Sequence, residues 1–271
     1  MTAETLSYFP GCSLQGTARE FDRTARAVCE ALGVTLRELP DWNCCGASSA
    51  HRTDEQLSIE LPARNLRIAA EQGMDLVIPC AACYNRVKAA QAHGGAGSDL
   101  AVISLLDLLA RPEVLGRLVD RAVRTLRELP VVPYYGCLLT RPAKVVGSAS
   151  AFEATAMDDL LLAVGADVRR WSCKTTCCGA SFTLAETDIV RKLCSQLRDV
   201  AVEAGAKAFV VACPMCLANL DTRQDGSPRL PTFFITELLA VALGLDVAGE
   251  CWKGHRTDPR ELLGEYGLIE P

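Results

Sequence analysis

The chain has 271 residues, of which 49% are hydrophobic, so it is long and apolar enough for one large domain or two ordinary ones. No apolar run approaches the roughly 20 residues that a membrane-spanning helix needs, and membrane association is therefore expected only through a partner. A net charge of −5 gives no electrostatic basis for nucleic-acid binding, and three histidines with 6% aromatic residues argue against histidine-rich metal sites and base-stacking surfaces.

Predicted strands and helices alternate along the chain. The strands are short apolar runs, whereas apolar residues in the helical segments recur at close to a 3.6-residue period, and glycine or proline ends several of those segments. In chain order, the predicted segments are a strand ending at Gly11-Cys12, helices Thr17–Leu32 and Asp54–Gln72, strand Asp75–Pro79, helix Arg111–Leu129, strand Val131–Tyr135, helices Met157–Val164 and Thr187–Ala204, and strand Ala208–Ala212.

This alternation favours an α/β fold built from βαβ units, with a mainly parallel sheet in each half. Because similar segments recur in the same order, we expect two duplicated Rossmann-like domains related by a pseudo-two-fold axis. Residues 1–130 would form the first domain, with Arg111–Leu129 as a helix that links it to the second. Residues 131–271 would form the second domain, and the tail from Ala248 onward, which lies outside the repeat, would wrap it.

Ten of the 14 cysteines follow one pattern that occurs twice. A lone cysteine precedes a Cys-Cys-Gly run, and a Cys-x-x-Cys pair begins 36 residues after the first cysteine of that run in both halves. The first set is Cys12, Cys44, Cys45, Cys80 and Cys83, and the second set is Cys137, Cys177, Cys178, Cys213 and Cys216. Since ligands of parallel sheets gather at the carboxyl ends of strands, both sets are expected there.

The cysteines have three competing explanations. Buried cysteine can act as a small apolar side chain, but this explains one or two scattered residues rather than ten in repeated register. A disulfide scaffold requires an oxidising compartment, and the first eight residues, which include Glu4, do not resemble a secretory signal. A cytoplasmic protein that binds metal through its thiols is therefore the favoured interpretation.

The adjacent cysteines bear on which metal is bound. Neighbouring side chains diverge, so two adjacent cysteines do not easily bind one small ion, but they can bind neighbouring irons of a cluster. Iron–sulfur clusters therefore fit better than zinc, and zinc in one site stays the alternative. The glycine after each pair either lets the backbone approach a cluster sulfide or serves an ordinary turn. The usual bacterial ferredoxin run is missing from the sequence, so electrons must come from another protein.

The repeated pattern resembles the cysteine-rich CCG domain family, and in particular the B-type subunits of heterodisulfide reductases. The resemblance extends from Tyr8 to about Leu263 and includes the tail segment Trp252-Lys253-Gly254-His255 followed by Asp258-Pro259-Arg260. Related iron–sulfur subunits of glycolate, lactate and atypical succinate oxidation systems include several with a fused ferredoxin-like domain or with cysteines missing from one motif. This sequence has neither feature, which favours the interpretation as a B-type heterodisulfide reductase subunit.

The resemblance implies a non-cubane 4Fe–4S cluster at each set of five cysteines, and the family reaction is reduction of a disulfide between the two clusters. The chain is then the disulfide-handling subunit of a heterodisulfide reductase-like complex, an oxidoreductase acting on a disulfide or a sulfur carrier. The implied partners are a ferredoxin-like iron–sulfur subunit of the C type and a flavin subunit of the A type. The alternative is an electron-transfer iron–sulfur subunit that links a succinate, glycolate or lactate dehydrogenase to a quinone pathway.

Four cysteines and four cations lie outside the repeated pattern but near it. Cys29 and Cys194 fall on apolar helix faces and are expected in the core, Cys173 is either a spare thiol near the second set or a loop residue, and Cys251 has no assigned role. An anionic disulfide would need cationic anchors, and otherwise these cations are solvated surface charges. The candidate substrate-binding residues are Arg141, which is preferred because Pro142 fixes its approach, and Lys174, Arg52 and Arg86.

Overall fold

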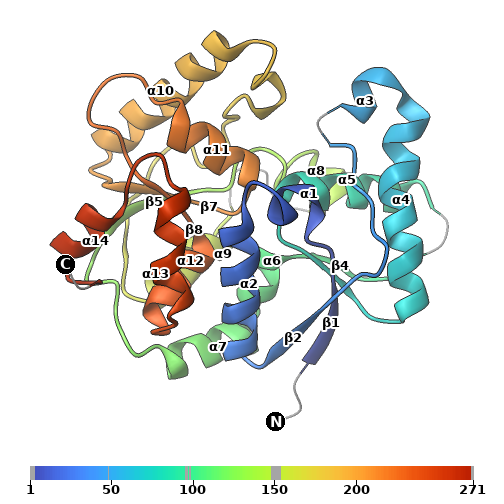
Figure 1. The fold of residues 1–271 in the computed structure, drawn as a ribbon, viewed down its shortest axis with the longest axis horizontal. Coiled ribbons are helices and arrows are strands. Elements are labelled where there is room, and N and C mark those ends of the chain that lie inside the picture. Colours follow the sequence, from blue (N-terminus) through green and yellow to red (C-terminus); the bar gives the residue numbers. More distant parts are fainter. Residues whose placement is uncertain (1–3, 48, 95–96, 98, 148–153, 270–271) are drawn as a thin grey trace.

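The two halves of the chain have the same architecture in the computed structural model, which describes residues 4–47, 49–94, 97, 99–147 and 154–269 (Figure 1). The first half contains β1 (Glu4–Tyr8), α1 (Gly11–Gln15), α2 (Arg19–Ala31), β2 (Val34–Glu38), α3 (Ala50–Thr53), α4 (Glu55–Gln72), β3 (Leu76–Ile78), α5 (Ala81–Ala92), β4 (Val102–Ser104), α6 (Leu105–Leu109) and α7 (Pro112–Arg121).

The second half repeats this order and adds a C-terminal tail. Its elements are β5 (Pro130–Tyr134), α8 (Ala143–Val146), α9 (Ala156–Ala163), β6 (Asp167–Val168), the 3-10 helix η1 (Ala180–Phe182), α10 (Thr187–Glu203), β7 (Ala208–Val211), α11 (Pro214–Thr222), β8 (Thr232–Phe234) and α12 (Ile235–Ala242). The tail consists of α13 (Val247–Cys251), the 3-10 helix η2 (Trp252–Gly254) and α14 (Arg260–Glu265).

Each half is built on a four-stranded parallel sheet, as the sequence predicts. The strand orders are β2-β1-β3-β4 and β6-β5-β7-β8, so corresponding strands occupy corresponding places. The inner strands β3, β5 and β7 are buried along their whole lengths, as expected for a parallel sheet that is covered on both faces. The prediction of two duplicated α/β halves is therefore confirmed.

The long helices begin and end close to their predicted limits because their caps are encoded locally. The side chain of Asp54 accepts a hydrogen bond from the Leu57 amide at 3.0 Å and starts α4. Gly73 ends the same helix with φ of 64°, a conformation that glycine adopts without steric cost. In the second half, α10 ends one residue before its predicted limit and Gly205 follows with φ of 78°.

The predicted linker helix over Arg111–Leu129 is wrong in its second half. Helix α7 ends at Arg121, its C-cap Ala122 still bonds to Leu118, and from Val123 onward the segment bonds to distant parts of the chain. The amides of Val123 and Arg124 both donate to the carbonyl oxygen of Ala242, at 2.9 and 3.1 Å. Two residues before the second sheet, at 127 and 128, also have positive φ values of 49° and 58°, which are incompatible with a continuing α-helix.

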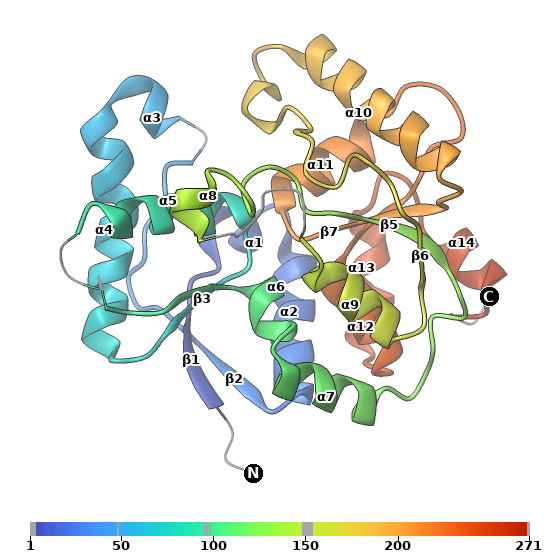
Figure 2. The ribbon, with the colours of Figure 1, turned by 180° about the vertical axis from the view of Figure 1, so that it is seen from behind.

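Helices of the two halves pack against each other across the interface. Helix α2 of the first half packs against α12 of the second, and α6 of the first packs against α9 of the second (Figures 1 and 2). At the first of these contacts, the rings of Phe21 and Phe234 stack with centroids 4.2 Å apart, and both are fully buried. This interface therefore contains part of the hydrophobic core and holds the carboxyl ends of the two sheets together.

The C-terminal tail does more than wrap the second half. Helix α13 packs against α2 of the first half, where Glu250 forms an ion pair with Arg23 and Cys251 lies within 4.0 Å of the Glu20 carbonyl oxygen. Farther along, the amides of Arg256 and Thr257 donate to the carboxylate of Asp221 in the second half. The prediction that the tail wraps only the second domain is thus incomplete, because the tail bridges both halves.

Within the described residues, no helix is both long and apolar enough to cross a membrane.

Candidate metal centres

The three loops that carry each set of cysteines follow three adjacent strands. Cys12 follows β1, the Cys44-Cys45 pair follows β2, and Cys80 follows β3, which lies beside β1 on its other side. The second half repeats this arrangement on β5, β6 and β7. Since strand order reverses at β1 and at β5, both sets lie at the crevice where parallel sheets usually bind ligands. The expectation that the cysteines gather at carboxyl ends of strands is confirmed.

The first set combines two exposed thiols with three buried ones. Cys12 and Cys44 are exposed and their sulfur atoms are 3.6 Å apart. Cys45 and Cys83 are buried with their sulfur atoms 3.2 Å apart, and Cys80 is buried at the N-terminus of α5. The set therefore opens to solvent on the side of the lone cysteine.

The second set lines a single small cavity. The sulfur atoms of Cys178 and Cys216 are 3.9 Å apart, and Cys177 is exposed. The cavity has a volume of about 20 Å³, and its described lining includes all five cysteines of the second set together with Tyr134, Tyr135, Leu138, Ala180, Met215 and Ala81 from the first half. The side chains of this set thus converge on one point, although the sequence separates them by up to 79 residues (137 to 216).

The two sets meet at the interface between the halves. Cys80 and Cys213, the first cysteines of the two Cys-x-x-Cys pairs, lie close enough that each thiol shifts the pKa of the other. Both thiols are buried. Ala81, which follows Cys80, also lines the cavity of the second set. The two sets are therefore neighbours in one continuous thiol-rich region.

In each half, the lone cysteine and the first cysteine of the Cys-Cys pair have opposite pKa shifts. Hydrogen bonding between Cys12 and Cys44 lowers the pKa of Cys44 to about 2, whereas the same contact and burial raise the pKa of Cys12. In the second half, the hydrogen bond from Cys137 lowers the pKa of Cys177 to about 6 and raises that of Cys137. The first cysteine of each Cys-Cys pair is therefore the more readily ionised, which suits a metal ligand because the thiolate is the ligating form.

The glycine before each lone cysteine allows the close packing of thiols. Gly11 has φ of 72°, and a Cβ atom there would lie 2.8 Å from the sulfur of Cys83. Gly136 has φ of 66°, and a Cβ atom there would lie 3.1 Å from the sulfur of Cys216. Only glycine combines this backbone conformation with so near an approach.

The glycine after each Cys-Cys pair serves the turn and the packing of the next helix. Gly46 has φ of 72°, and a Cβ atom there would lie 2.7 Å from the Ala50 side chain. Gly179 has φ of 80°, and a Cβ atom there would lie 3.0 Å from Leu193. The Gly179 amide also donates to the Cys177 sulfur at 3.3 Å, which orients that ligand.

Cysteines outside the pattern stay outside the two sets, and most are core residues. Cys29 and Cys194 are fully buried, as predicted, and burial raises the pKa of each to about 12. Cys251 is buried in α13 and donates to the Val247 carbonyl oxygen. Cys173 is half-buried beside Ser172 and does not line the cavity of the second set.

Two of the four predicted substrate cations are engaged with protein groups near the second set. A guanidinium nitrogen of Arg141 lies 3.4 Å from Thr175 Oγ1, and the charge of Arg141 adds to the hydrogen bonding that lowers the pKa of Cys177. Lys174 forms an ion pair with Asp158. Arg52 is exposed on α3, and Arg86 is half-buried on α5. None of the four lines the cavity of the second set.

One residue that supports the second set of cysteines was not predicted from the sequence. Asn219 is fully buried on α11, and its amide group donates to the backbone oxygen of Cys178 at 3.3 Å and to the sulfur at 3.6 Å. Its own oxygen accepts from Thr183. An asparagine one helical turn after a Cys-x-x-Cys pair is a detectable signal, because buried amides near metal ligands usually orient them.

The donor set fits an iron–sulfur cluster in its chemistry. All ten side chains are thiols, and Gly179 and Asn219 supply hydrogen bonds to sulfur, the kind that tunes such clusters. Within the described part of the chain, no group of three cysteine, histidine or acidic side chains is close enough to hold a single metal ion. The five thiols of the second set already surround one point, as ligands of a single group would.

Known sequences are similar to this chain over most of its length. The 8-methylmenaquinol:fumarate reductase membrane anchor subunit of Wolinella succinogenes is 29% identical over 282 residues, which cover 95% of this chain and 98% of that protein. The heterodisulfide reductase B-like protein of Archaeoglobus profundus is 24% identical, with 90% and 93% covered. The B-type subunit of the ferredoxin/F(420)H(2)-dependent CoB-CoM heterodisulfide reductase of Methanosarcina acetivorans is also 24% identical, with 88% and 89% covered.

Similarity extends to a solved structure and to a domain family. A solved structure of a hypothetical protein from Helicobacter pylori matches with a TM-score of 0.69 at 12% identity over 93% of this chain, which spans about half (52%) of that one; the likeness concerns the fold alone. The cysteine-rich CCG domain model matches residues 6–88 and again residues 131–221, and each match contains one set of five cysteines. The chain therefore belongs to the cysteine-rich CCG domain family, whose domain it contains twice.

Proposed function

We propose that this chain is an electron-transfer iron–sulfur subunit of a reductase or dehydrogenase complex of the fumarate or succinate type, working with a quinone. In this proposal each set of five thiols holds one non-cubane 4Fe–4S cluster, with Cys12, Cys44, Cys45, Cys80 and Cys83 binding the first and Cys137, Cys177, Cys178, Cys213 and Cys216 the second. Clusters bound there would exchange one electron each, as iron–sulfur clusters do.

The observation that carries the proposal is the proximity of the two sets. Cys80 and Cys213 lie close enough to shift each other's pKa, and Ala81, which follows Cys80, lines the cavity of the second set, so two redox groups held by these thiols would be neighbours. Two neighbouring one-electron sites suit a two-electron partner such as a quinone. The protein contributes the thiolate ligands, with Cys44 and Cys177 already favoured in the ionised form, and the buried surroundings that keep water away from Cys80 and Cys213.

Two findings favour the quinone pathway over a disulfide. The relative from Wolinella succinogenes, whose name includes a menaquinol and fumarate, covers nearly the whole of both chains at 29% identity. In addition, Lys174 is paired with Asp158, which weakens it as an anchor for an anionic disulfide. The chain's partners would then be the catalytic and iron–sulfur subunits of such a complex.

Reduction of a disulfide is the second candidate function. The specific observation in its favour is again the proximity of Cys80 and Cys213, because a disulfide placed between the two sets could be divided between them. The relatives named as heterodisulfide reductase proteins of the B type also support it. In that case the complex would include a flavin subunit together with a ferredoxin-like one.

Reoxidation of the reduced protein distinguishes these functions. The anaerobic protein is reduced with dithionite, freed of excess reductant, and mixed with menadione or with glutathione disulfide while the visible absorbance of the clusters is followed by stopped flow. The proposal predicts rapid reoxidation by menadione and little by the disulfide. Rapid reoxidation by the disulfide alone would replace the quinone pathway with the second candidate.

A further inference from the structure

The duplication places a carboxylate at the same point in both halves. Asp107 is the third residue of α6, which follows the last strand of the first sheet, and Glu237 is the third residue of α12, which follows the last strand of the second. In each case one carboxylate oxygen bonds to the residue before the helix. Asp107 Oδ2 accepts from Ser104 Oγ at 2.7 Å, and Glu237 Oε2 accepts from the Phe234 amide at 2.8 Å.

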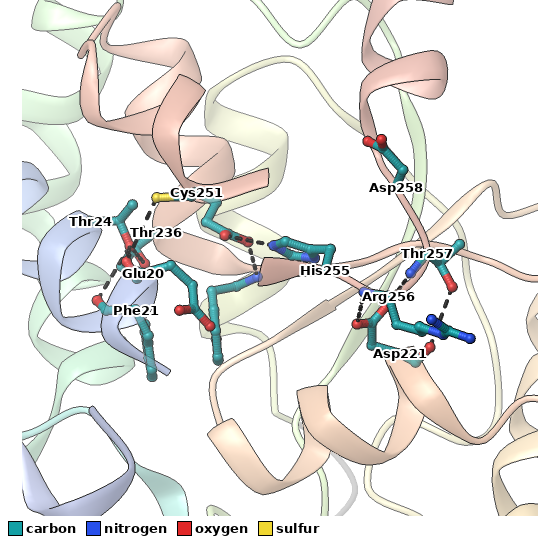
Figure 3. A network of polar contacts seen from close by, with 12 residues as sticks. Glu20, Phe21, Thr24, Asp221, Thr236, Cys251, His255, Arg256, Thr257 and Asp258 are labelled. Carbon is teal, nitrogen blue, oxygen red and sulfur yellow. Dashed lines mark hydrogen bonds and ion pairs between the residues drawn. The ribbon is translucent and has the colours of Figure 1, made fainter. Parts of the chain in front are cut away.

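The second oxygen of Glu237 is occupied by a ring from the C-terminal tail. His255 Nε2 lies 2.9 Å from Glu237 Oε1, and both side chains are buried, with 1% and 0% of their surfaces exposed. Figure 3 shows the His255 ring on the C-terminal tail. The next two residues of the tail, Arg256 and Thr257, donate their amide hydrogens to the carboxylate of Asp221. The His255 ring therefore satisfies the second oxygen of the Glu237 carboxylate.

Asp107 instead lines an open cavity. Its Oδ1 has no hydrogen-bond partner among the described residues, and the residue is exposed. The cavity lies between the halves and has a volume of about 390 Å³, within the range of small-molecule sites. The two carboxylates thus differ in one respect, since the tail supplies a ring to Glu237 and no described residue supplies one to Asp107.

The walls beside the two carboxylates also correspond. Next to Glu237, Thr236 of α12 contacts Thr24 of α2, with hydroxyl oxygens 2.7 Å apart, as Figure 3 shows. Next to Asp107, Leu106 of α6 and Ala156 of α9 line the cavity. The packed helices α2 and α12 therefore border the site that His255 occupies at Glu237. The equivalent pair, α9 and α6, borders the open cavity at Asp107.

The lining of the open cavity suits a neutral ring with hydroxyl groups. Tyr84 and Tyr135 contribute aromatic surface, Leu139 and Val146 contribute aliphatic surface, and Asp107 is the only charged side chain among the described lining residues. The four candidate substrate cations do not line it. An anionic ligand would meet a carboxylate without a balancing cation, so the lining disfavours anionic disulfides.

The cavity also touches the cysteine loops of both halves. Tyr84 directly follows Cys83, and Tyr135 lines both this cavity and the cavity of the second cysteine set. Thr140, another lining residue, lies in the turn after Cys137 and within 3.4 Å of its carbonyl oxygen. A ligand in this cavity would therefore lie one side chain away from the second thiol set.

From these observations we infer that the cavity binds the ring of a hydroquinone, with one hydroxyl group donating a hydrogen bond to Asp107 Oδ1 as His255 does to Glu237. The inference rests on the proposed function, because a hydroquinone is the electron donor that a quinone-linked subunit would meet. It concerns binding alone, and the affinity for a hydroquinone can be measured whatever the metal content of the protein.

Calorimetric titration of the anaerobic protein with menadiol tests the inference, with the dimethyl ether of menadiol as the matched ligand that lacks hydrogen-bond donors. Menadiol is expected to bind at least tenfold more tightly than the ether, since a hydrogen bond to a charged group is lost. D107N is expected to weaken menadiol binding by about tenfold or more, whereas E237Q, at the equivalent but occupied carboxylate, should change it less than twofold. A154F, which fills the cavity without altering Asp107, should abolish binding.

Three results would overturn the inference: equal binding of the ether, unchanged binding to D107N that is verified as folded by circular dichroism, or displacement of menadiol by glutathione disulfide. If menadiol binds as expected but the protein contains only zinc, the binding site stands and the proposed electron-transfer function fails. If the protein holds iron–sulfur clusters but D107N and A154F bind menadiol like the wild type, the cavity is not the site and the proposed function is unaffected.

Discussion

The glycine before each lone cysteine is the residue on which the packing of the thiols most directly depends. Gly11 lies where any Cβ atom would come within 2.8 Å of the Cys83 sulfur, and its φ of 72° is itself unfavourable for other residues. Gly33 has nearly the same φ, 74°, but no atom lies within 4 Å of a Cβ placed there. Substitutions at Gly11 and Gly33 can therefore distinguish the free-energy cost of the backbone conformation from the cost of crowding the thiols.

G11A is expected to lower both stability and bound iron, because the new methyl group displaces the Cys83 sulfur. G33A is the matched control and should cost only about 1–2 kcal/mol of stability, the penalty of a left-handed alanine, with full iron content. Urea unfolding and iron analysis of the two variants check this. Equal iron content in G11A and the wild type would show that the close approach of Gly11 to Cys83 is unimportant.

The adjacent cysteines are where the proposed five-thiol ligation differs from ordinary four-thiol ligation. C45S and C178S are each expected to abolish the non-cubane spectroscopic signal of one cluster, whereas C29S, in the core and outside both sets, should leave both signals intact. Electron paramagnetic resonance of the three anaerobic variants tests this. A wild-type spectrum from C45S or C178S would mean that four thiols suffice in that half.

At the level of single residues, the sequence predicts the cysteine sets well because their spacing repeats almost without change. It does not predict Asn219, whose counterpart three residues after the first Cys-x-x-Cys pair is Arg86 rather than another amide. It also hides the relation between Asp107 and Glu237, since these residues differ in type and only the fold places both at the third position of equivalent helices.

Among the elements, the C-terminal tail has the clearest testable role. Its His255 is the only ring that reaches Glu237, among the described residues, and H255A would leave a buried carboxylate without its partner. Removing one member of a buried pair typically costs about 3–5 kcal/mol. We expect a loss of this size in urea unfolding and a smaller loss in the double variant H255F/E237L, which removes both charges. A larger loss in the double variant would contradict a stabilising pair.

The same pair predicts how stability changes with pH. Burial alone would lower the pKa of His255, but the hydrogen bond and the charge of Glu237 outweigh burial and raise it. The protonated form is therefore favoured in the folded state, so the contribution is fully present below the unfolded-state pKa of about 6.5 and is lost as pH rises through the higher folded-state pKa. The difference in unfolding free energy between wild type and H255F/E237L should shrink above neutral pH, and a constant difference would refute it.

Secondary structure could be predicted where its signals are local. Asp54 and Gly73 set the limits of α4 by capping, and both are visible in the sequence. Residues 122–129 could not be assigned in this way, because the amides of Val123, Arg124 and Leu126 bond to Ala242 and Val164, which are distant in the chain. Likewise, periodicity predicts that α2 has an apolar face but not that Phe21 meets Phe234 of the other half.

At the scale of the whole molecule, duplication produces the functional arrangement. Each half brings its five thiols to the carboxyl end of its own sheet, and helices of the two halves pack against each other across the interface. Cys80 and Cys213 of the two sets lie close together in this arrangement. Two halves of unlike structure would not place two equivalent sites side by side, and we infer that this pairing is what the duplication provides.

The most direct test of this account is the content of iron and acid-labile sulfide in anaerobically purified protein, with zinc measured on the same sample. Two clusters of four irons predict about eight irons and eight sulfides per chain with little zinc. Loss of about half of this content in C213S would agree with one cluster in each half. Protein that contains only stoichiometric zinc would contradict the central claim that each set of five thiols holds an iron–sulfur cluster.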